Sequence, residues 1–443
     1  MKIYPSLRSA SIIALVFILA MSCTSNWPQF RGPENNMVPL VKNLPQVWGD
    51  GQNIKWEYPL EGNGWSSPIV WGDKIFITEV TLDENSYTPD TTKARPGRRP
   101  EYPQDGHYRW MVYCLDKNSG ELIWEQMALE GKPRIEIHRD NTYASETPAT
   151  DGKMLYVNFG MHGLFCYDLE GNLVWERDFG SYPTDGDWGV STSPVVYKNI
   201  LYMQIDSEEK SVLYALDKKT GEEIWSVPRE EKTNYSTPVI WKNKTRTELV
   251  TMGLKARSYD PGTGKLIWEL DLGGGRNIAS PVYDKNTIYL GMEKRRDGGG
   301  TLFAVKAGSE GDITPSEGES TSSGVLWSVP NSGLSMPTPV LYKGYIYITD
   351  RRPGAMHCYE ASTGRIIYQK TRITDAGPFW ASPWAYDDKI FCPDERGTTH
   401  VIKAGEEFEI LSTNFIDDKF WSSAAMIDNA LILRGVSNLY YVE

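Results

Sequence analysis

The chain has 443 residues, a formal net charge of −12, 16 Trp, 25 Tyr and 40 Gly. A strongly acidic surface argues against nucleic acid as a partner, because phosphate binding needs a basic face. Abundant aromatic residues and glycines are typical of many short strands joined by tight turns. The length would allow several domains, but it also suits one large ring of small sheets.

The first 22 residues have the pattern of a signal peptide. Lys2 and Arg8 precede an apolar run at 12–20, which is too short to span a bilayer. The run leads into Ala20-Met21-Ser22-Cys23, which resembles the lipobox of bacterial lipoproteins. The alternative is a plain secretory signal.

The lipobox resemblance implies that Cys23 carries lipid, including palmitate, and binds the chain to a membrane. Residues 23–52 would then be a lipid-anchored N-terminal segment. Thr24 follows Cys23 where enteric lipoproteins retained at the inner membrane carry Asp, so the outer membrane is favoured.

One unit recurs along the rest of the chain about every 40–45 residues, which is the period of a four-stranded propeller blade. A Ser/Thr-rich step leads into Pro and a β-branched strand, two further strands follow, and Asp-x-x-(Thr/Ser)-Gly precedes a strand that ends in Trp. The clearest copy runs from Ser193 to Trp225. The copies open at Pro68, Pro148, Pro194, Pro238, Pro281, Pro339 and Pro383, with Ala424 in the eighth place.

The closing strands are one fewer than the openings, because the eighth copy stops at Glu443. Residues 53–58 have the pattern of the missing strand. The sequence therefore predicts an all-β, eight-bladed propeller with four-stranded blades over residues 53–443, closed by the N-terminal strand so that no sheet edge is free. The closing aromatic residues are Trp124, Trp175, Trp225, Trp268 and Trp327, with Tyr368 in the sixth blade and none at 408–411 in the seventh.

Two insertions interrupt the period, at 81–107 and at 307–324. The second is rich in Gly, Ser and Glu, and its composition predicts a disordered loop. Each closing Trp is expected to pack on the neighbouring blade and to donate its N–H to a strand or turn carbonyl.

The cysteines share a strand position with small residues. Cys114, Cys166 and Cys358 occupy the place that Ala215 and Ser258 fill in other copies. A position that accepts Cys, Ala or Ser is a packing position, so no disulfide is predicted.

The Asp-x-x-Thr-Gly-x-x-(Ile/Leu)-Trp unit resembles the tryptophan-docking motif of pyrroloquinoline-quinone (PQQ) dehydrogenases, which also occurs in outer-membrane assembly lipoproteins of the BamB type. The runs 27–33 (Trp-Pro-Gln-Phe-Arg-Gly-Pro), 64–68 and 141–145 resemble a branch of exported PQQ-binding-like repeat proteins. The resemblance covers 27–443. It implies the fold but not the function, because enzymes and scaffolds share the repeat.

Signatures of catalysis are sparse. The adjacent cysteines of many PQQ dehydrogenases and the Cys-x-x-Cys-His of haem attachment are absent from the sequence. The five histidines lack zinc-ligand spacing, so no metal site is predicted. Smaller PQQ-dependent sugar dehydrogenases also lack both cysteine motifs, so PQQ with calcium stays open as a cofactor.

The residues just before each Ser-x-Pro should ring one mouth of the central channel. Aromatic residues interleaved with Asn, Asp and Arg suit a flat polar ligand, although they could equally cover the blade ends. No catalytic residue is identified; Asp187 and Glu146 are the carboxylates nearest this mouth. The candidate ligand-binding residues are Trp65, Tyr143, Asp187, Trp188, Tyr235, Arg276, Asn277, Trp380 and Trp421.

Three classes of function fit these patterns. The first is a cell-envelope lipoprotein that acts as a scaffold for a ligand or a protein partner. The second is a PQQ-binding quinoprotein that oxidises an alcohol or a sugar. The third is a carbohydrate-binding lipoprotein of polysaccharide utilisation. The expected partners are the membrane through Cys23, and an envelope protein or a saccharide.

Overall fold

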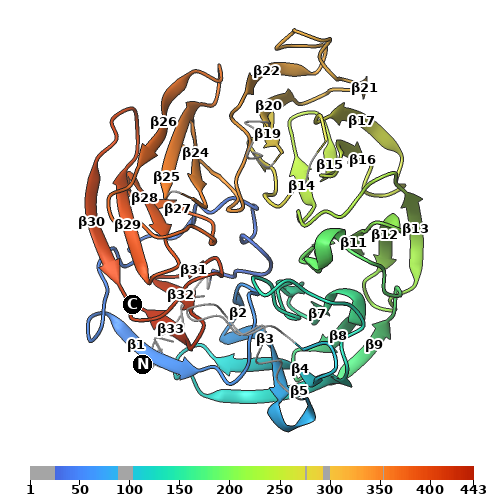
Figure 1. Cartoon of the computed structure of the whole chain (residues 1–443), viewed down its shortest axis with the longest axis vertical. Coiled ribbons are helices and arrows are strands. Elements are labelled where there is room, and N and C mark those ends of the chain that lie inside the picture. The colour runs from blue at the N-terminus through green and yellow to red at the C-terminus, as the bar shows by residue number, and fades with distance from the viewer. Residues whose placement is uncertain (1–24, 88–102, 275–276, 293–299, 353) are drawn as a thin grey trace, which may run out of the picture.

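The computed structural model describes residues 25–87, 103–274, 277–292, 300–352 and 354–443 (Figure 1). Cys23 and Arg276 lie outside these residues. Eight sheets form a ring around a central axis, and the described residues contain only three short 3-10 helices, at Glu84–Ser86, Gly160–His162 and Asp185–Asp187. The predicted eight-bladed β-propeller is therefore confirmed. No helix in the described ranges is long and apolar enough to cross a membrane.

In each blade the first four strands form an antiparallel sheet, and they follow one another in chain order from the ring axis outward, except in blade 8, where the N-terminal strand is outermost. Blades 1 and 2 comprise β2 (Ile69–Trp71), β3 (Lys74–Asp83), β4 (His107–Asp116) and β5 (Leu122–Gly131), then β6 (Ala149–Thr150), β7 (Met154–Asn158), β8 (Leu164–Asp168) and β9 (Leu173–Arg177). Blades 3 and 4 comprise β10 (Val195–Tyr197), β11 (Ile200–Asp206), β12 (Ser211–Asp217) and β13 (Glu223–Pro228), then β14 (Val239–Lys242), β15 (Thr247–Thr251), β16 (Lys255–Tyr259) and β17 (Leu266–Asp271).

The second half of the ring repeats this order. Blades 5 and 6 comprise β18 (Val282–Tyr283), β19 (Thr287–Gly291), β20 (Thr301–Lys306) and β22 (Val325–Pro330), then β23 (Val340–Tyr342), β24 (Tyr345–Asp350), β25 (Ala355–Glu360) and β26 (Ile366–Arg372). Blades 7 and 8 comprise β27 (Trp384–Tyr386), β28 (Lys389–Pro393), β29 (Thr398–Lys403) and β30 (Ile410–Phe415), then β31 (Ala425–Ile427), β32 (Ala430–Arg434), β33 (Asn438–Val442) and β1 (Ile54–Pro59).

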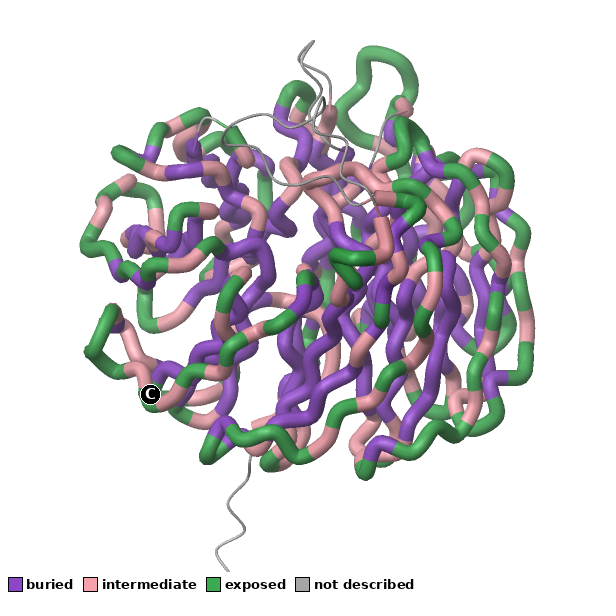
Figure 2. Tube along the Cα trace, turned by 60° about the horizontal axis from the view of Figure 1, so that its bottom comes forward, coloured by how far each residue is buried: buried purple, intermediate pink, exposed green. Residues whose placement is uncertain are grey.

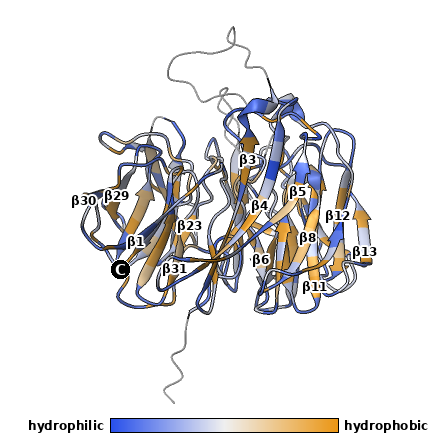
Figure 3. Ribbon diagram, turned by 90° about the horizontal axis from the view of Figure 1, so that it is seen from below, coloured by the Kyte–Doolittle hydropathy of each residue, from blue (hydrophilic) through white to orange (hydrophobic). Residues whose placement is uncertain are grey.

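The N-terminal strand closes the ring, as the sequence predicts. β1 pairs antiparallel with β33, with Ile54 opposite Val442 and Pro59 opposite Asn438. The strands run between two faces of the ring (Figure 3). We call the face with the turns between first and second strands the turn face, and the face with the connections between blades the mouth face. Buried residues fill the strands, and exposed residues gather in the loops and on the outer rim (Figure 2).

Indole rings dock on glycines of the next blade at five of the interfaces. The indole N–H donates to a turn carbonyl over 3.0–3.3 Å, and the ring lies over the glycine that ends the same turn. A Cβ on Gly264 would come within 2.7 Å of the Trp225 ring, and its φ of +72° also favours glycine. The donor–acceptor pairs are Trp56–Lys117, Trp124–Leu169, Trp175–Lys218, Trp225–Pro261 and Trp327–Ala361.

Blade 4 departs from this pattern because the insertion at 307–324 is ordered. Within it, β21 (Gly311–Asp312) pairs in parallel with β17 and adds a fifth strand to blade 4. Trp268 is fully buried under this addition and donates to Glu248 Oε2 of its own blade over 2.7 Å. The prediction of a disordered loop is wrong, because pairing with the edge of β17 and burial of Ile313 outweigh the polar composition.

Blade 7 receives its missing indole from the N-terminal segment. Trp48 is buried and stacks at 6.1 Å from Phe391. In blade 3 the closing Trp225 contacts Tyr202 of the second strand in the same way, with ring centroids 5.9 Å apart. The Trp48 amide also donates to Asn414 Oδ1 of β30 over 3.1 Å. A segment outside the repeats therefore completes the seventh blade.

The same segment lies along the innermost strands and narrows the central channel. Trp27 pairs with Val70 of blade 1, and the Met37 carbonyl accepts from Ala385 of blade 7. Arg31 is buried and donates to the carbonyls of Asn35 and Pro339, both over 2.7 Å. Burial lowers the pKa of Arg31 to about 9. Residues 25–48 thus bind the innermost strands on both sides of the ring, where Figure 1 draws them in blue.

The docking contact between blades 3 and 4 can be tested by a double-mutant cycle. We expect Trp225→Ala to lower the free energy of unfolding by about 3 kcal/mol, because it removes a large half-buried ring. Gly264→Ala should also destabilise, since its methyl group would meet that ring. In the double variant the clash is absent, so the two losses should not add. Urea unfolding measures all four proteins, and additive losses would contradict the docking geometry.

Candidate functional site at the ring mouth

Three of the predicted residues form one stack at the mouth face. Trp380 and Trp421 have ring centroids 3.7 Å apart with an interplanar angle of 17°, and Trp65 lies 5.0 Å from Trp421 at 22°. They precede the innermost strands of blades 7, 8 and 1, which are neighbours in the ring. The shared register of the repeat therefore brings together residues that are far apart in the sequence.

Arg351 extends this stack into blade 6. Its guanidinium carbon lies 3.9 Å from the centroid of the Trp380 ring. Trp421 approaches the same ring equally closely, so the two must lie on opposite faces of Trp380. The Trp380 indole N–H donates to Glu395 Oε2 over 3.1 Å. Trp380 is thus held by a cation on one face, an indole on the other and a carboxylate at its edge.

An ion pair crosses the mouth. Arg351 Nη2 lies 3.2 Å from Asp140 Oδ2, and Asp140 leads into blade 2, half a ring away from blade 6. The connection 132–141, which we call the mouth loop, therefore reaches over the channel. Trp188 contacts the mouth loop and is not part of the Trp stack. Its ring stacks on that of His138, with the ring centroids 3.8 Å apart.

The remaining predicted residues lie elsewhere. Tyr143 is buried and donates to the Ile135 carbonyl over 3.0 Å. Tyr235 and Asn277 are buried between blades 4 and 5, where the Tyr235 amide donates to the Asn277 carbonyl over 2.9 Å. Asp187 is exposed at the end of the short 3-10 helix Asp185–Asp187 and has a φ of +54°. Arg276 lies outside the described residues.

Four residues of the site were not predicted: Arg351, Asp140, His138 and Glu395. The predicted residues all lie directly before a Ser-x-Pro or its equivalent, whereas Arg351 and Glu395 follow the second strands of their blades. A signal did exist for Arg351. The opening of blade 6, Leu334-Ser335-Met336, has neither an aromatic nor a charged residue, and the same blade carries Arg351-Arg352 on the same face.

A buried acid and a buried imidazole lie beneath the mouth loop. Glu146 and His162, with Tyr143 and Val190, line a small cavity of about 10 Å³. Burial raises the pKa of Glu146 to about 8, and burial together with Arg134 lowers the pKa of His162 to about 4. Both side chains are therefore neutral near pH 7. Glu146 Oε1 and His162 Nε2 have no hydrogen-bond partner within the described part of the chain.

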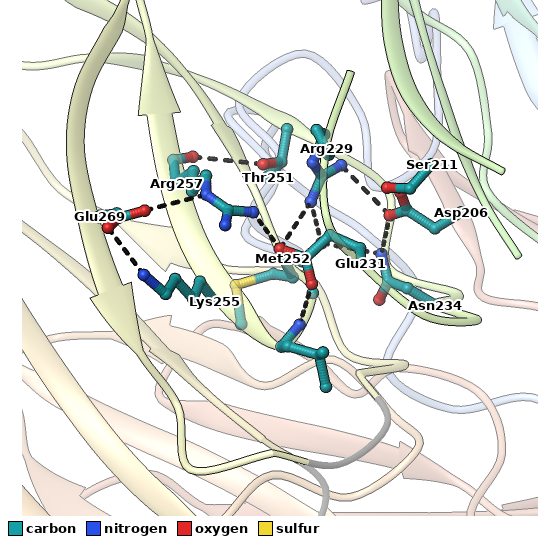
Figure 4. A network of polar contacts seen from close by, with 12 residues as sticks. Asp206, Ser211, Arg229, Glu231, Asn234, Thr251, Met252, Lys255, Arg257 and Glu269 are labelled. Carbon is teal, nitrogen blue, oxygen red and sulfur yellow. Dashed lines mark hydrogen bonds and ion pairs between the residues drawn. The ribbon is translucent and has the colours of Figure 1, made fainter. Parts of the chain in front are cut away.

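A charge network fills the interface of blades 3 and 4 (Figure 4). Arg229, fully buried, pairs with Asp206 over 3.2 Å and donates to the Met252 carbonyl over 2.9 Å. Arg257 bridges Glu231 and Glu269. Lys255 pairs with Glu269, so the network contains three cations and three carboxylates. Because its charges balance, we infer that it stabilises the packing of the two blades. No cluster of His, Cys, Asp or Glu that would suit a metal occurs among the described residues.

The buried Glu146 makes stability depend on pH. Between its usual value of 4.5 and about 8, the folded protein retains a proton that the unfolded chain loses. Stability should therefore fall as pH rises through this window. In Glu146→Gln that decline should be absent, so the variant should gain on the order of 3 kcal/mol over the wild type between pH 5 and pH 8.5. Urea unfolding at several pH values measures this, and parallel profiles for the two proteins would contradict the assignment.

Known proteins share the repeat and the ring. A family model described as outer membrane protein assembly factor BamB matches residues 109–370. Tetrathionate hydrolase of Acidithiobacillus ferrooxidans is 21% identical over 340 residues, which cover 70% of this chain and 59% of that protein. BamB of Yersinia pestis is 22% identical over 309 residues, covering 67% of this chain and 68% of its own. This chain thus spans under two thirds of the hydrolase.

Two solved structures share the fold at low sequence identity. BamB of Moraxella catarrhalis superposes with a TM-score of 0.59 and 12% identity, covering 88% of this chain and 99% of its own. The quinohemoprotein alcohol dehydrogenase of Comamonas testosteroni superposes with a TM-score of 0.58 and 12% identity, covering 94% of this chain and 80% of its own. At such identity the likeness establishes the architecture alone.

Proposed function

The chain belongs to the family of the outer membrane protein assembly factor BamB, and we propose that it is a lipid-anchored scaffold of the cell envelope that holds a partner protein. On this proposal the partner binds the mouth face. The propeller itself carries out no chemistry. The alternatives, a PQQ-dependent dehydrogenase and a carbohydrate-binding protein, are distinguished by the experiments below.

The proposal rests on one observation: the mouth residues contact one another. Both faces of Trp380 are occupied, by Arg351 and by Trp421. Arg351, the cation best placed to meet an anionic ligand, is paired with Asp140 over 3.2 Å. A planar quinone would have to displace these contacts before it could stack. A preassembled surface of aromatic rings and paired charges instead suits a protein interface, where Trp, Tyr and Arg are enriched.

The N-terminal segment supports the same view. Residues 25–48 line the innermost strands of several blades and narrow the channel from the turn face. A substrate of an enzyme working in the channel would have to enter from the mouth face. There the mouth loop is tied across the ring by Asp140.

The scaffold proposal is tested in cells and with the purified protein. In the source organism, loss of this protein should reduce the folded, heat-modifiable fraction of outer-membrane β-barrel proteins, and the wild-type chain should restore it. An unchanged outer-membrane profile would contradict an assembly role. Purified protein incubated with PQQ and calcium should retain no quinone and reduce no dye with alcohols or sugars. Quinone retention with dye reduction would instead establish the dehydrogenase, and oligosaccharide binding alone the carbohydrate-binding protein.

On this proposal, a lipid on Cys23 would leave the ring at the turn face. Ser25 is held at the turn face, where its amide donates to Asp428 Oδ1 over 2.8 Å. Cys23 is two residues earlier, so a lipid on Cys23 would start within about 7 Å of Ser25. The turn face would then face the membrane, and the mouth face would point away from it toward soluble partners.

Replacement of the anchor residue tests this arrangement. Cys23→Ser should abolish fatty-acid labelling and move the protein from the membrane fraction to the soluble fraction, because no acyl chain can be attached. The lipid-anchor proposal fails if wild-type protein takes up no fatty acid.

A further inference from the structure

We propose that the turn face of blades 6 and 7 docks on the bilayer, with Leu40 inserted among the lipids from an apolar tip formed by residues 38–41 (Val-Pro-Leu-Val). The inference rests on the proposed lipid anchor, whose exit lies on the same face. It adds a second, direct contact between the protein and the membrane.

The apolar tip carries the most exposed large hydrophobic side chain in the described residues. Leu40 is 85% exposed, whereas the next, Leu173, is 52% exposed. Single exposed hydrophobic residues are common on protein surfaces. Leu40, however, lies between Val38 and Val41, which are half-buried because they pack against the core of the ring, and Lys42 follows. The loop is therefore anchored on the ring and presents Leu40 outward. An apolar loop flanked by lysine is suited to the boundary between headgroups and acyl chains.

The tip is held in place at both ends. Before it, the Asn36 side chain exchanges hydrogen bonds with the backbone of Leu341, over 2.9 and 3.2 Å. After it, the Asn43 amide donates to the Tyr386 hydroxyl over 2.6 Å. Little conformational entropy would therefore be lost when Leu40 enters the lipid. Tyr342 and Tyr386 lie at the adjoining turns, and tyrosine is enriched where membrane meets water.

Apart from Lys42, the charges beside the tip lie in pairs of opposite sign. Lys343 pairs with Asp388, and Lys389 lies 3.1 Å from Asp387. A surface with balanced charge has no strong attraction to anionic headgroups. We therefore infer that burial of Leu40 drives docking, with little dependence on salt or on anionic lipid.

The tip and the anchor share one face. Asp428, which holds Ser25, lies in the turn between β31 and β32. Tyr342 and Tyr386 begin the corresponding turns of blades 6 and 7. Equivalent turns of consecutive blades lie side by side, so an anchored chain holds the tip at the membrane surface and raises its effective concentration there.

A fluorescent probe at position 40 tests the docking. Leu40→Cys, labelled with NBD in the acylated protein, is reconstituted into phosphatidylcholine vesicles; the four cysteines of the propeller are buried. We expect a blue-shifted emission and quenching by lipids that carry doxyl groups. The matched control is Leu411→Cys, at an exposed position on the outer strand of blade 7, whose probe should report water. A water-like signal at position 40 overturns the proposal.

A second experiment separates docking from anchoring. In the Cys23→Ser background, Leu40→Asp should weaken co-sedimentation with phosphatidylcholine vesicles about tenfold, and Leu411→Asp should have little effect. Binding that needs anionic lipid and disappears in salt would overturn apolar insertion. The proposal is also overturned if the emission of the probe at position 40 shifts to the blue when protein concentration is raised without vesicles, because the probe would then be covered by a second copy of the chain. If wild-type protein isolated from cells carries no acyl group and its binding to vesicles still depends on Leu40, the lipid anchor is refuted and docking through Leu40 stands.

Discussion

The contact of an indole ring with a glycine of the next blade is the interaction on which this ring depends. A sheet of three or four strands cannot bury both of its faces by itself, so each blade is stable only against its neighbours. The indole covers the turn of the next blade and ties it by one hydrogen bond from its N–H to a carbonyl. The glycine is required because a Cβ there would occupy the space of the ring. Repeated around the axis, this contact sets the spacing and the register of the blades.

Where the repeat is incomplete or altered, other segments supply strands and rings. Trp48 supplies the ring for blade 7, β1 supplies the outer strand of blade 8, and β21 covers the outer edge of blade 4. Trp48 belongs to the N-terminal segment, and β1 follows it directly in the chain. Residues 25–59 therefore close the ring, complete a blade and narrow the central opening. The first described residue of this stretch, Ser25, lies at the turn face beside Asp428.

The mouth face illustrates how a repeat fold builds a surface from distant residues. Register alone brings Trp65, Trp380 and Trp421 together. The surface is then completed by Arg351 and Asp140, which approach one another from opposite sides of the ring. Because these groups contact one another, the surface is already assembled within the chain itself. A preassembled aromatic surface is well suited to protein recognition, since little side-chain freedom is lost on binding.

The number of blades, the closing strand and the docking role of most tryptophans could be predicted from the sequence, because each depends on a local pattern that repeats with a fixed period. The same register predicted that nine residues would ring one mouth; of these, Trp65, Trp380 and Trp421 form one stack, whereas Trp188 stacks on His138. Three features could be read only from the folded ring: which mouth residues contact each other, the burial of Tyr143 and Asn277, and the order of 307–324. These features depend on contacts between segments with no common period: the crossing of Asp140 to Arg351, the insertion of Trp48 into blade 7 and the pairing of β21 with β17. A periodic pattern specifies the neighbours within and between blades, but contacts across the ring are fixed only when the ring has closed.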